Sequence, residues 1–188
     1  MKRAFDICLS LVLLACLFPL MLVGAVLIRL TSDGPALFVQ ERVGRNERSF
    51  RCLKFRTMAL GAPVGATHTV STDWVTPIGR LMRRSKFDEL PQLLNVFFGQ
   101  MSLVGPRPCL PVQAELRDER RKRNVFSVRP GITGLAQVSG IDMSEPARLA
   151  EVDAQYVATR TFWTDLVILW RTAFGGNRPA SRTTGQSF

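Results

Sequence analysis

This 188-residue chain has few of the residues that histidine- or cysteine-based chemistry requires. Its single histidine, His68, lies in a stretch of small residues, so a histidine pair or a Ser-His-Asp triad is not expected. No C-x-x-C pair occurs, which excludes the usual zinc spacings and a disulfide framework and favours a reducing compartment. The P-loop, G-x-G-x-x-G and H-E-x-x-H motifs are also absent. The four cysteines are Cys8, Cys16, Cys52 and Cys109.

Acidic residues are in the minority. There are 15 Asp and Glu against 25 Lys and Arg, a net charge of +10. This excess favours an anionic partner, which could be nucleic acid, an acidic lipid surface or a phosphorylated substrate. The composition, 46% hydrophobic and 21% charged, is that of a folded domain with a sizeable core.

One long apolar run occupies residues 7–28, with Lys2 and Arg3 before it and Arg29 after it. As a helix it would be about 33 Å long, roughly the thickness of a bilayer core. A cleaved secretory signal is disfavoured, because the apolar region is overlong and no small-x-small site precedes Arg29. Basic residues favour the cytoplasmic side of a membrane, so both ends of this run are expected on that side. A straight span would place them on opposite sides.

Pro19 stands near the middle of this run. It lacks a backbone donor, its ring crowds the carbonyl of Ala15, and it disfavours the helical region for Phe18. A kink there would allow a re-entrant helix that enters and leaves on one face. Kinked spanning helices also exist, so the residues alone leave both arrangements open.

The remaining sequence predicts an α+β, helix-rich domain with amphipathic helices and a short β-hairpin. Strands are expected at 36–43 and 49–55, on either side of a Gly44-Arg45-Asn46 turn. A surface loop is expected at 61–73, a rigid proline-rich loop at 101–111 and a type II turn at Pro130-Gly131. Helices are expected at 74–87, 88–100, 112–124 and 145–174.

The helix expected at 74–87 has a basic face and an apolar face. Its basic side chains follow i, i+3, i+4 spacing, which places them together. They are Arg80, Arg83 and Arg84, with Ile78, Leu81 and Met82 on the apolar side. In the last helix, the aromatic residues near Trp163 and Trp170 are expected in the core rather than at a membrane interface.

Asp88 and Glu89 are adjacent acids directly after the basic helix. One interpretation is structural: Ser85 and Asp88 have the spacing of a capping box, and acids stabilise a helix N-terminus. The other is chemical: a carboxylate held ionised beside cations could bind Mg²⁺ or attack phosphorus. A diphosphate substrate would need both the cations and the metal.

Three further cations are candidate substrate ligands. Arg107 lies between Pro106 and Pro108, whose rings limit the backbone and present the guanidinium for bidentate contact with phosphate. Lys54 and Arg56 are alternate residues of an expected strand and share a face. An ordinary solvated position is the alternative for each.

Three blocks resemble the bacterial sugar transferase family, the monotopic phosphoglycosyl transferases. They are DGPALFVQERVGR…FRCLKFRTM at 33–58, KFDELPQLLNVFFGQMSLVGPRP at 86–108 and RPGITGLAQVSG at 129–140, in family order and spacing. The resemblance extends from Lys2 to about Phe174 and is to the small, single-domain form. Phe18 stands where the family usually has serine, and Gln100 where it usually has aspartate.

The resemblance implies transfer of a sugar 1-phosphate from a UDP-sugar to polyprenyl (undecaprenyl) phosphate, with release of UMP. It implies that Asp88, paired with Glu89, attacks the β-phosphorus and forms a phosphosugar-aspartyl intermediate, with Mg²⁺ near Asp88. The family's substrate-binding positions fall on Lys54, Arg83, Arg107 and Asp165. Arg107 and Asp165 are expected at the nucleotide end.

The resemblance also implies a re-entrant membrane helix, residues 1–30, broken at Pro19, and a catalytic domain, residues 31–174. Residues 175–188 are expected to be a mobile tail. The chain is expected on the cytoplasmic face of the bacterial inner membrane, beside anionic lipid, as a monotopic protein; a homo-oligomer is left open. The donor sugar is not specified, although 61–76 and 141–152 are the segments expected to select it.

Two other functions compete with the enzyme. A membrane-tethered basic protein could bind lipid or nucleic acid without catalysis, but its cations are interleaved with acids and no nucleic-acid module is present. A spanning anchor with a cytoplasmic interaction domain is the other. The sequence favours an enzyme that takes no nucleic acid as a partner.

Overall fold

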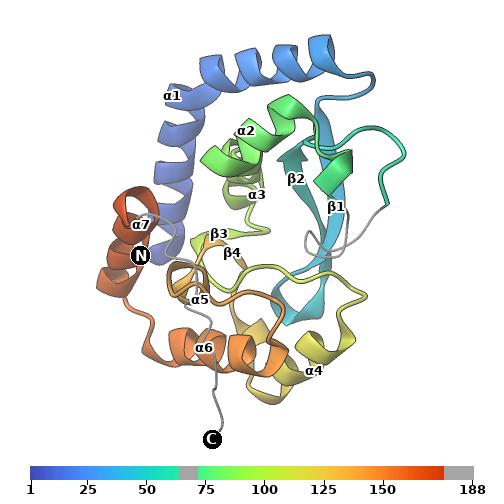
Figure 1. Ribbon diagram of the computed structural model, residues 1–188. Helices are drawn as coiled ribbons and strands as arrows, with labels where there is room; N and C mark the ends of the chain where they lie inside the picture. Colours follow the sequence, from blue (N-terminus) through green and yellow to red (C-terminus); the bar gives the residue numbers. More distant parts are fainter. Residues whose placement is uncertain (64–71, 176–188) are drawn as a thin grey trace, which may run out of the picture.

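The structure is a computed structural model that describes residues 1–63 and 72–175. A long N-terminal helix, α1, passes along two sides of a small α+β domain that contains two two-stranded sheets (Figure 1). The predicted α+β, helix-rich class is therefore confirmed. Much of the loop predicted at 61–73, including His68, and the tail predicted from 175 lie outside the described residues.

Helix α1 (Lys2–Thr31) is continuous through its one proline, Pro19, and bends sharply about midway (Figure 1). Proline is the usual cause of such a bend. The first half packs against the main core through residues such as Phe5 and Leu13. The second half packs through Met21 and Ile28 against a separate cluster around α2. The bend thus lets one helix cover two faces of the domain.

The predicted hairpin is confirmed. Strand β1 (Leu37–Val43) pairs antiparallel with β2 (Ser49–Phe55), and the short 3₁₀ turn η1 (Arg45–Glu47) joins them. Asn46 and Glu47 have positive φ values in this turn. The side-chain amide of Asn95 bonds both Leu53 N and Arg51 O, so the hairpin is tied to α3.

Helix α2 (Pro77–Ser85) begins with Thr76 as its N-cap and ends at Lys86, which has a left-handed conformation with φ of 57°. The predicted capping box is wrong, because the Ser85 hydroxyl donates to the Leu81 and Met82 carbonyls. Asp88 instead lies in a 3₁₀ turn, η3 (Phe87–Glu89), before α3 (Gln92–Phe97). Leu81, expected on the apolar side, is 63% exposed.

A second sheet was not predicted. Strand β3 (Ser102–Val104) pairs in parallel with β4 (Gly131–Thr133), where the sequence had predicted a rigid loop and a type II turn. Gly131 is needed for this close pairing, since a Cβ there would lie 2.7 Å from the Gly105 Cα. Asp6 of α1 binds the same strand, accepting from the Ser102 hydroxyl and Leu103 N.

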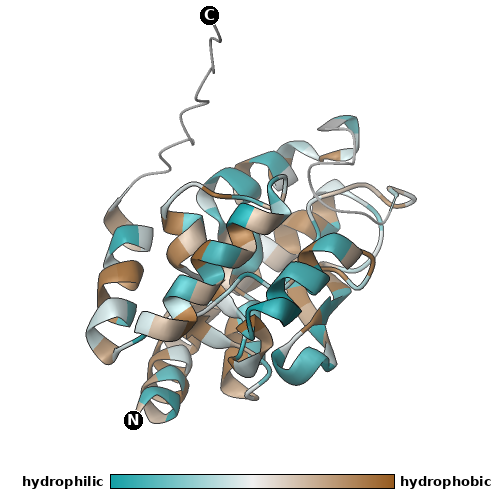
Figure 2. Ribbon diagram, turned by 90° about the horizontal axis from the view of Figure 1, so that it is seen from below, coloured by the Kyte–Doolittle hydropathy of each residue, from teal (hydrophilic) through white to brown (hydrophobic). Residues whose placement is uncertain are grey.

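Helices form the rest of the domain. They are α4 (Ala114–Lys122), α5 (Leu135–Val138), α6 (Pro146–Thr159) and α7 (Phe162–Phe174), with the 3₁₀ turns η2 (Thr72–Trp74) and η4 (Val125–Ser127). The single helix predicted for 145–174 is thus two helices. Several helices are hydrophobic on one side and hydrophilic on the other (Figure 2). The core prediction is wrong for Trp163 and Trp170, which are 74% and 63% exposed.

Candidate active site

The acid pair lies in the short turn between α2 and α3. Phe87, the first residue of this turn, stacks on Phe55 of β2, with ring centroids 5.5 Å apart. It also packs against Gly24 of α1, where a Cβ would lie only 2.5 Å from the ring. The turn that holds Asp88 and Glu89 is therefore fixed between the long apolar helix and the hairpin.

Glu89 is held by two of the predicted cations. Its Oε1 accepts from Lys54 Nζ at 2.9 Å and from Arg107 Nη2 at 2.7 Å. Burial acts to raise the pKa of Glu89, but Arg107 and Lys54 outweigh it and the pKa lies well below its usual range. Glu89 is therefore an anion that joins β2 to the Pro-Arg-Pro loop.

Asp88 is in a different state. It is 9% exposed, and its carboxylate takes no hydrogen bond or ion pair from the residues that the structure describes. Burial and the neighbouring Glu89 charge raise its pKa, while Lys54, Arg83 and Arg107 act in the opposite direction. The carboxylate is thus close to three cations without being bound by any of them, which leaves its oxygens open to a substrate or an ion.

Arg83 is oriented by the hairpin side of the site. Its Nε donates to the Thr57 hydroxyl at 2.9 Å, and Thr57 O accepts from Thr76 N at the start of α2. Arg83 was predicted as a site residue only from the family motif. In the structure, its hydrogen bond to Thr57 directs the guanidinium toward the turn that carries Asp88.

The loop that carries Arg107 has every carbonyl from Pro106 to Pro108 hydrogen-bonded. Gly131 N donates to Pro106 O at 2.9 Å, Arg120 Nη1 to Arg107 O at 2.8 Å, and Arg42 Nη1 to Pro108 O at 3.0 Å. Arg42 and Arg120 are buried, and Arg120 is only 1% exposed. Two buried guanidinium groups therefore fix the loop that presents Arg107 to Glu89.

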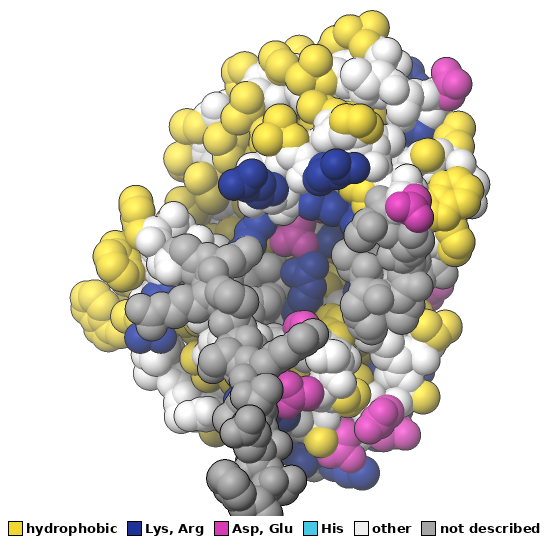
Figure 3. Space-filling view, in the orientation of Figure 1, with side chains coloured by type: hydrophobic (Ala, Val, Ile, Leu, Met, Phe, Trp, Pro, Cys, Tyr) yellow, Lys and Arg dark blue, Asp and Glu magenta, His cyan; other side chains and the backbone are white. Residues whose placement is uncertain are grey.

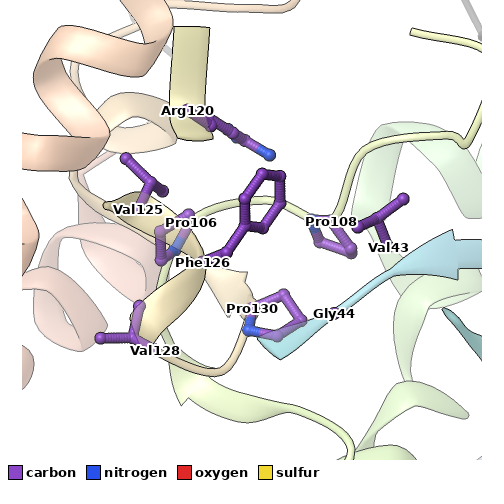
Figure 4. A pocket seen from close by; sticks show the side chains of 9 residues that line it. All are labelled: Val43, Gly44, Pro106, Pro108, Arg120, Val125, Phe126, Val128 and Pro130. Carbon is purple, nitrogen blue, oxygen red and sulfur yellow. The ribbon is translucent and has the colours of Figure 1, made fainter. Parts of the chain in front are cut away.

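A small cavity lies on the other side of this loop. Figure 4 shows Phe126 pointing between Pro106 and Pro108, with Arg120 above it and Pro130 below. Its volume of about 10 Å³ leaves room for a single water at most, so it cannot hold a nucleotide.

Arg56 and Asp165 are not brought together with the acid pair. Arg56 donates to the Ser32 carbonyl at 2.9 Å and to the Asp33 carbonyl, and so holds the chain that follows α1. Asp165 is buried and accepts from Lys2 and from the Tyr156 hydroxyl. Each has a local structural partner, and their predicted substrate contacts stay predictions.

Acidic and basic side chains lie side by side on one face of the molecule. In Figure 3, acidic side chains are visible among Lys and Arg side chains, below the apolar surface over the second half of α1. An anionic substrate that approaches this face would meet the cations beside the carboxylates.

The acid pair fits a divalent cation only in part. Within residues 1–63 and 72–175, no three His, Cys, Asp or Glu side chains gather in a metal-type cluster. Mg²⁺ is commonly held by one or two carboxylates with substrate phosphates completing its shell. Asp88, with its open carboxylate, and Glu89 fit that mode and not a dedicated protein cage.

Comparisons with known proteins give the family. Residues 1–177 match the family described as Bacterial sugar transferase. An undecaprenyl-phosphate glucose phosphotransferase from Komagataeibacter xylinus is 42% identical over 91% of this chain and 35% of its own length. A UDP-glucose:undecaprenyl-phosphate glucose-1-phosphate transferase from Caulobacter vibrioides is 38% identical over 100% of this chain and 72% of its own.

A third relative is of similar size to this chain. The exopolysaccharide production protein PSS from Rhizobium leguminosarum bv. phaseoli is 42% identical, with 92% of both chains covered. This chain therefore spans about a third of the Komagataeibacter protein but most of the other two. The family predicted from the motifs is confirmed: this chain belongs to the bacterial sugar transferase family and is a phosphoglycosyl transferase enzyme.

Proposed function

We propose that this chain transfers a sugar 1-phosphate from a UDP-sugar to undecaprenyl phosphate through a covalent intermediate on Asp88. The observation that carries the proposal is the contrast within the acid pair. Glu89 is bound by Lys54 and Arg107, whereas the Asp88 carboxylate is unbound beside the same cations. The names of the Caulobacter and Rhizobium relatives support a UDP-sugar donor, an undecaprenyl phosphate acceptor and a place in exopolysaccharide synthesis.

The first step joins Asp88 to the donor. A carboxylate oxygen of Asp88 attacks the β-phosphorus of the UDP-sugar, and the bond from that phosphorus to the oxygen bridging to the α-phosphate breaks. UMP leaves with the bonding electrons, and the sugar phosphate is left as an acyl phosphate on Asp88. In the second step an oxygen of undecaprenyl phosphate attacks the same phosphorus, which restores the carboxylate and forms the lipid diphosphate.

The cations can assist both steps. Lys54, Arg83 and Arg107 oppose the rise in the Asp88 pKa that burial and Glu89 cause, so they favour its ionised, nucleophilic form. The same groups can bind diphosphate oxygens, and fixed cations stabilise charge that develops during phosphoryl transfer. Glu89 has a positioning role, because its ionised carboxylate holds Lys54 and Arg107 in place.

Mg²⁺ is part of the proposal, with oxygens of Asp88 and Glu89 as its ligands from the protein. When bound, the ion would neutralise charge on the diphosphate.

The membrane arrangement is also proposed: α1 is re-entrant and both of its ends lie at the cytoplasmic face. The first turn is bound to the domain by Arg3, which donates to the Val96 and Phe97 carbonyls, and by Asp6. The chain after the helix is bound to the same domain by Arg56. A straight span would separate these two ends, whereas a bent helix that returns keeps both contacts.

Labelling of introduced cysteines tests this arrangement, since the native Cys52 and Cys109 that remain are buried. Ala4→Cys, at an exposed position, is placed in a background with Cys8→Ser and Cys16→Ser, and Ser49→Cys in the same background reports the cytoplasmic domain. With an impermeant maleimide, both positions should react only after the cells are lysed. Reaction of Ala4→Cys in intact cells would establish a span.

UMP release tests the reaction. Protein in nanodiscs is given a panel of UDP-sugars with Mg²⁺, first without and then with undecaprenyl phosphate. The wild type should release about one UMP per active site without acceptor, and a phosphosugar mass should appear on Asp88. Asp88→Asn should lose both signals while keeping its melting temperature. Normal turnover by this variant would show that Asp88 is not the nucleophile.

A further inference from the structure

Two arginine side chains on α2 have no partner. Arg80 and Arg84 are exposed and four residues apart, and within the described part of the chain neither side chain forms a hydrogen bond or an ion pair. Like charges at this spacing on a helix destabilise it. Arg83, by contrast, is directed to Thr57. The surface of α2 therefore carries two positive charges that no described acid compensates.

The position of these charges is between the apolar helix and the acid pair. The opposite side of α2 packs through Ile78 and Met82 against the second half of α1. That half of α1 exposes a row of large apolar residues: Leu20, Leu22, Val23, Val26, Leu27 and Leu30. The last turn of α2 leads directly into the turn that holds Asp88. In Figure 3, basic side chains lie over α2, below the apolar surface of α1.

A ligand for this surface must combine an apolar body with an anionic end. An apolar chain can lie along α1, and a phosphate at its end would meet the α2 arginines before it reached Asp88. Arginine is suited to phosphate because its planar group donates two parallel hydrogen bonds. The donor needs other cations, and Lys54, Arg83 and Arg107 are already grouped around the acid pair.

We propose that Arg80 and Arg84 bind the phosphate of the polyprenyl phosphate acceptor as it passes from the bilayer to the phosphosugar on Asp88. This inference rests on the proposed two-step function and assigns its acceptor side. On this inference, Lys54, Arg83 and Arg107 bind the UDP-sugar, and Arg80 with Arg84 binds the polyprenyl phosphate. The two sets serve different half-reactions, and each half-reaction can be measured alone.

The variants are Arg80→Gln, Arg84→Gln and the double variant. The matched control is Arg48→Gln with Arg51→Gln, which removes the same charge from two exposed arginines of the hairpin region, away from α2. All proteins are held in zwitterionic nanodiscs, so that bulk anionic lipid does not contribute. UMP release is measured as a single burst without acceptor and then as steady turnover against acceptor concentration.

We expect the burst of each variant to remain within about twofold of wild type. The KM for undecaprenyl phosphate should rise about fivefold for each single variant and about twentyfold for the double variant, from the usual worth of one basic residue near a lipid phosphate. The control should change neither quantity. The variant with Arg80→Lys and Arg84→Lys should have a KM close to that of the wild type, because the phosphate requires a cation at these positions.

Three results would overturn the inference. Loss of the burst in the double variant would place these arginines on the donor. An unchanged acceptor KM in these nanodiscs, with a loss of activity that occurs only in nanodiscs of anionic lipid, would assign them to phospholipid headgroups. An equal rise of the acceptor KM in the control would show that the effect comes from the net charge of the protein and not from Arg80 and Arg84. Absence of a burst and of a phosphosugar adduct in the wild type is a separate outcome, because it would refute the proposed function itself.

Discussion

The buried pair of Arg120 and Asp153 links the stability of the domain to the loop that carries Arg107. Arg120 donates to Asp153 Oδ2 from Nε at 3.0 Å and from Nη2 at 2.6 Å, and to the Arg107 carbonyl from Nη1 at 2.8 Å. Both side chains are almost fully buried. Arg120→Met removes the cation, keeps most of the apolar volume and leaves Asp153 without its partner.

The expected loss is large. Removing one partner of a buried ion pair costs about 3–5 kcal/mol. For a chain of this size, 1 kcal/mol corresponds to a change of about 2–4 °C in melting temperature, so Arg120→Met should melt about 6–20 °C lower. The double variant Arg120→Met with Asp153→Leu removes the stranded carboxylate. Its free energy of unfolding should fall by less, about 1–3 kcal/mol, which is mainly the cost of the unpaired Arg107 carbonyl.

The pH dependence gives a second test of the same cause. Burial already raises the pKa of Asp153, and Arg120 acts against that rise. Without Arg120 the pKa of the folded state should rise further above the unfolded value of about 3.9. A raised carboxyl pKa favours the protonated folded form, so the stability deficit of Arg120→Met should shrink as pH falls through that pKa.

The assay is thermal unfolding in nanodiscs, followed by circular dichroism between pH 8 and pH 5, with UMP release as a parallel measurement. Arg120→Met should also lose activity through the displaced Arg107. If the double variant melts as low as the single one, or if the deficit is the same at every pH, then the stranded charge is not the cause. The loss would then come from the other contacts of Arg120, such as its hydrogen bond to the Arg107 carbonyl.

The site and the long helix give three more predictions. As pH falls, the burst of UMP release should be lost at a pH above the ordinary aspartate pKa, because burial and Glu89 raise the pKa of Asp88. In Glu89→Gln, the residual burst should be lost only at lower pH. Gly79→Ala should melt several degrees lower and lose activity, since its Cβ would lie 2.7 Å from Thr57 Cα and displace α2; wild-type melting would refute this. Pro19→Ala should straighten α1 and expose part of the Ala4→Cys population to the outside in intact cells; unchanged protection would show that docking alone sets the bend.

The parts of the fold that were predictable have local causes. The hairpin alternates apolar and polar residues around a turn, and strand pairing follows from that period. Pro19 limits its own helix through its missing donor, so the bend could be foreseen. The acid pair and Arg107 were found from motifs, and Arg107 also from the two prolines beside it.

The parts that were missed depend on contacts between distant segments. Strands β3 and β4 have three residues each and pair only because Gly105 and Gly131 allow close approach. Arg42 reaches the Pro108 carbonyl from 66 residues away. No local period predicts either feature, and in the sequence a buried arginine looks like any surface cation.

The error over the aromatic residues has another cause. Trp163, Val167, Trp170 and Phe174 follow helical spacing on α7, and all four are exposed. An apolar stripe indicates only that one face avoids water. It does not distinguish a protein core from a membrane surface, so the pattern was correct about the apolar face of α7 and wrong about the surroundings of that face.

The anchoring of the first helix has a consequence for the order of synthesis. Lys2 binds Asp165, which is 163 residues later in the chain, and Asp6 binds Ser102, 96 residues later. At about 5–20 residues per second, roughly 10–30 s pass between translation of Lys2 and translation of its partner. During that interval the polar groups of Lys2 and Asp6 lack their native partners. The position of α1 against the domain can therefore be set only when α7 has been translated, so a segment translated early is among the last to reach its native position.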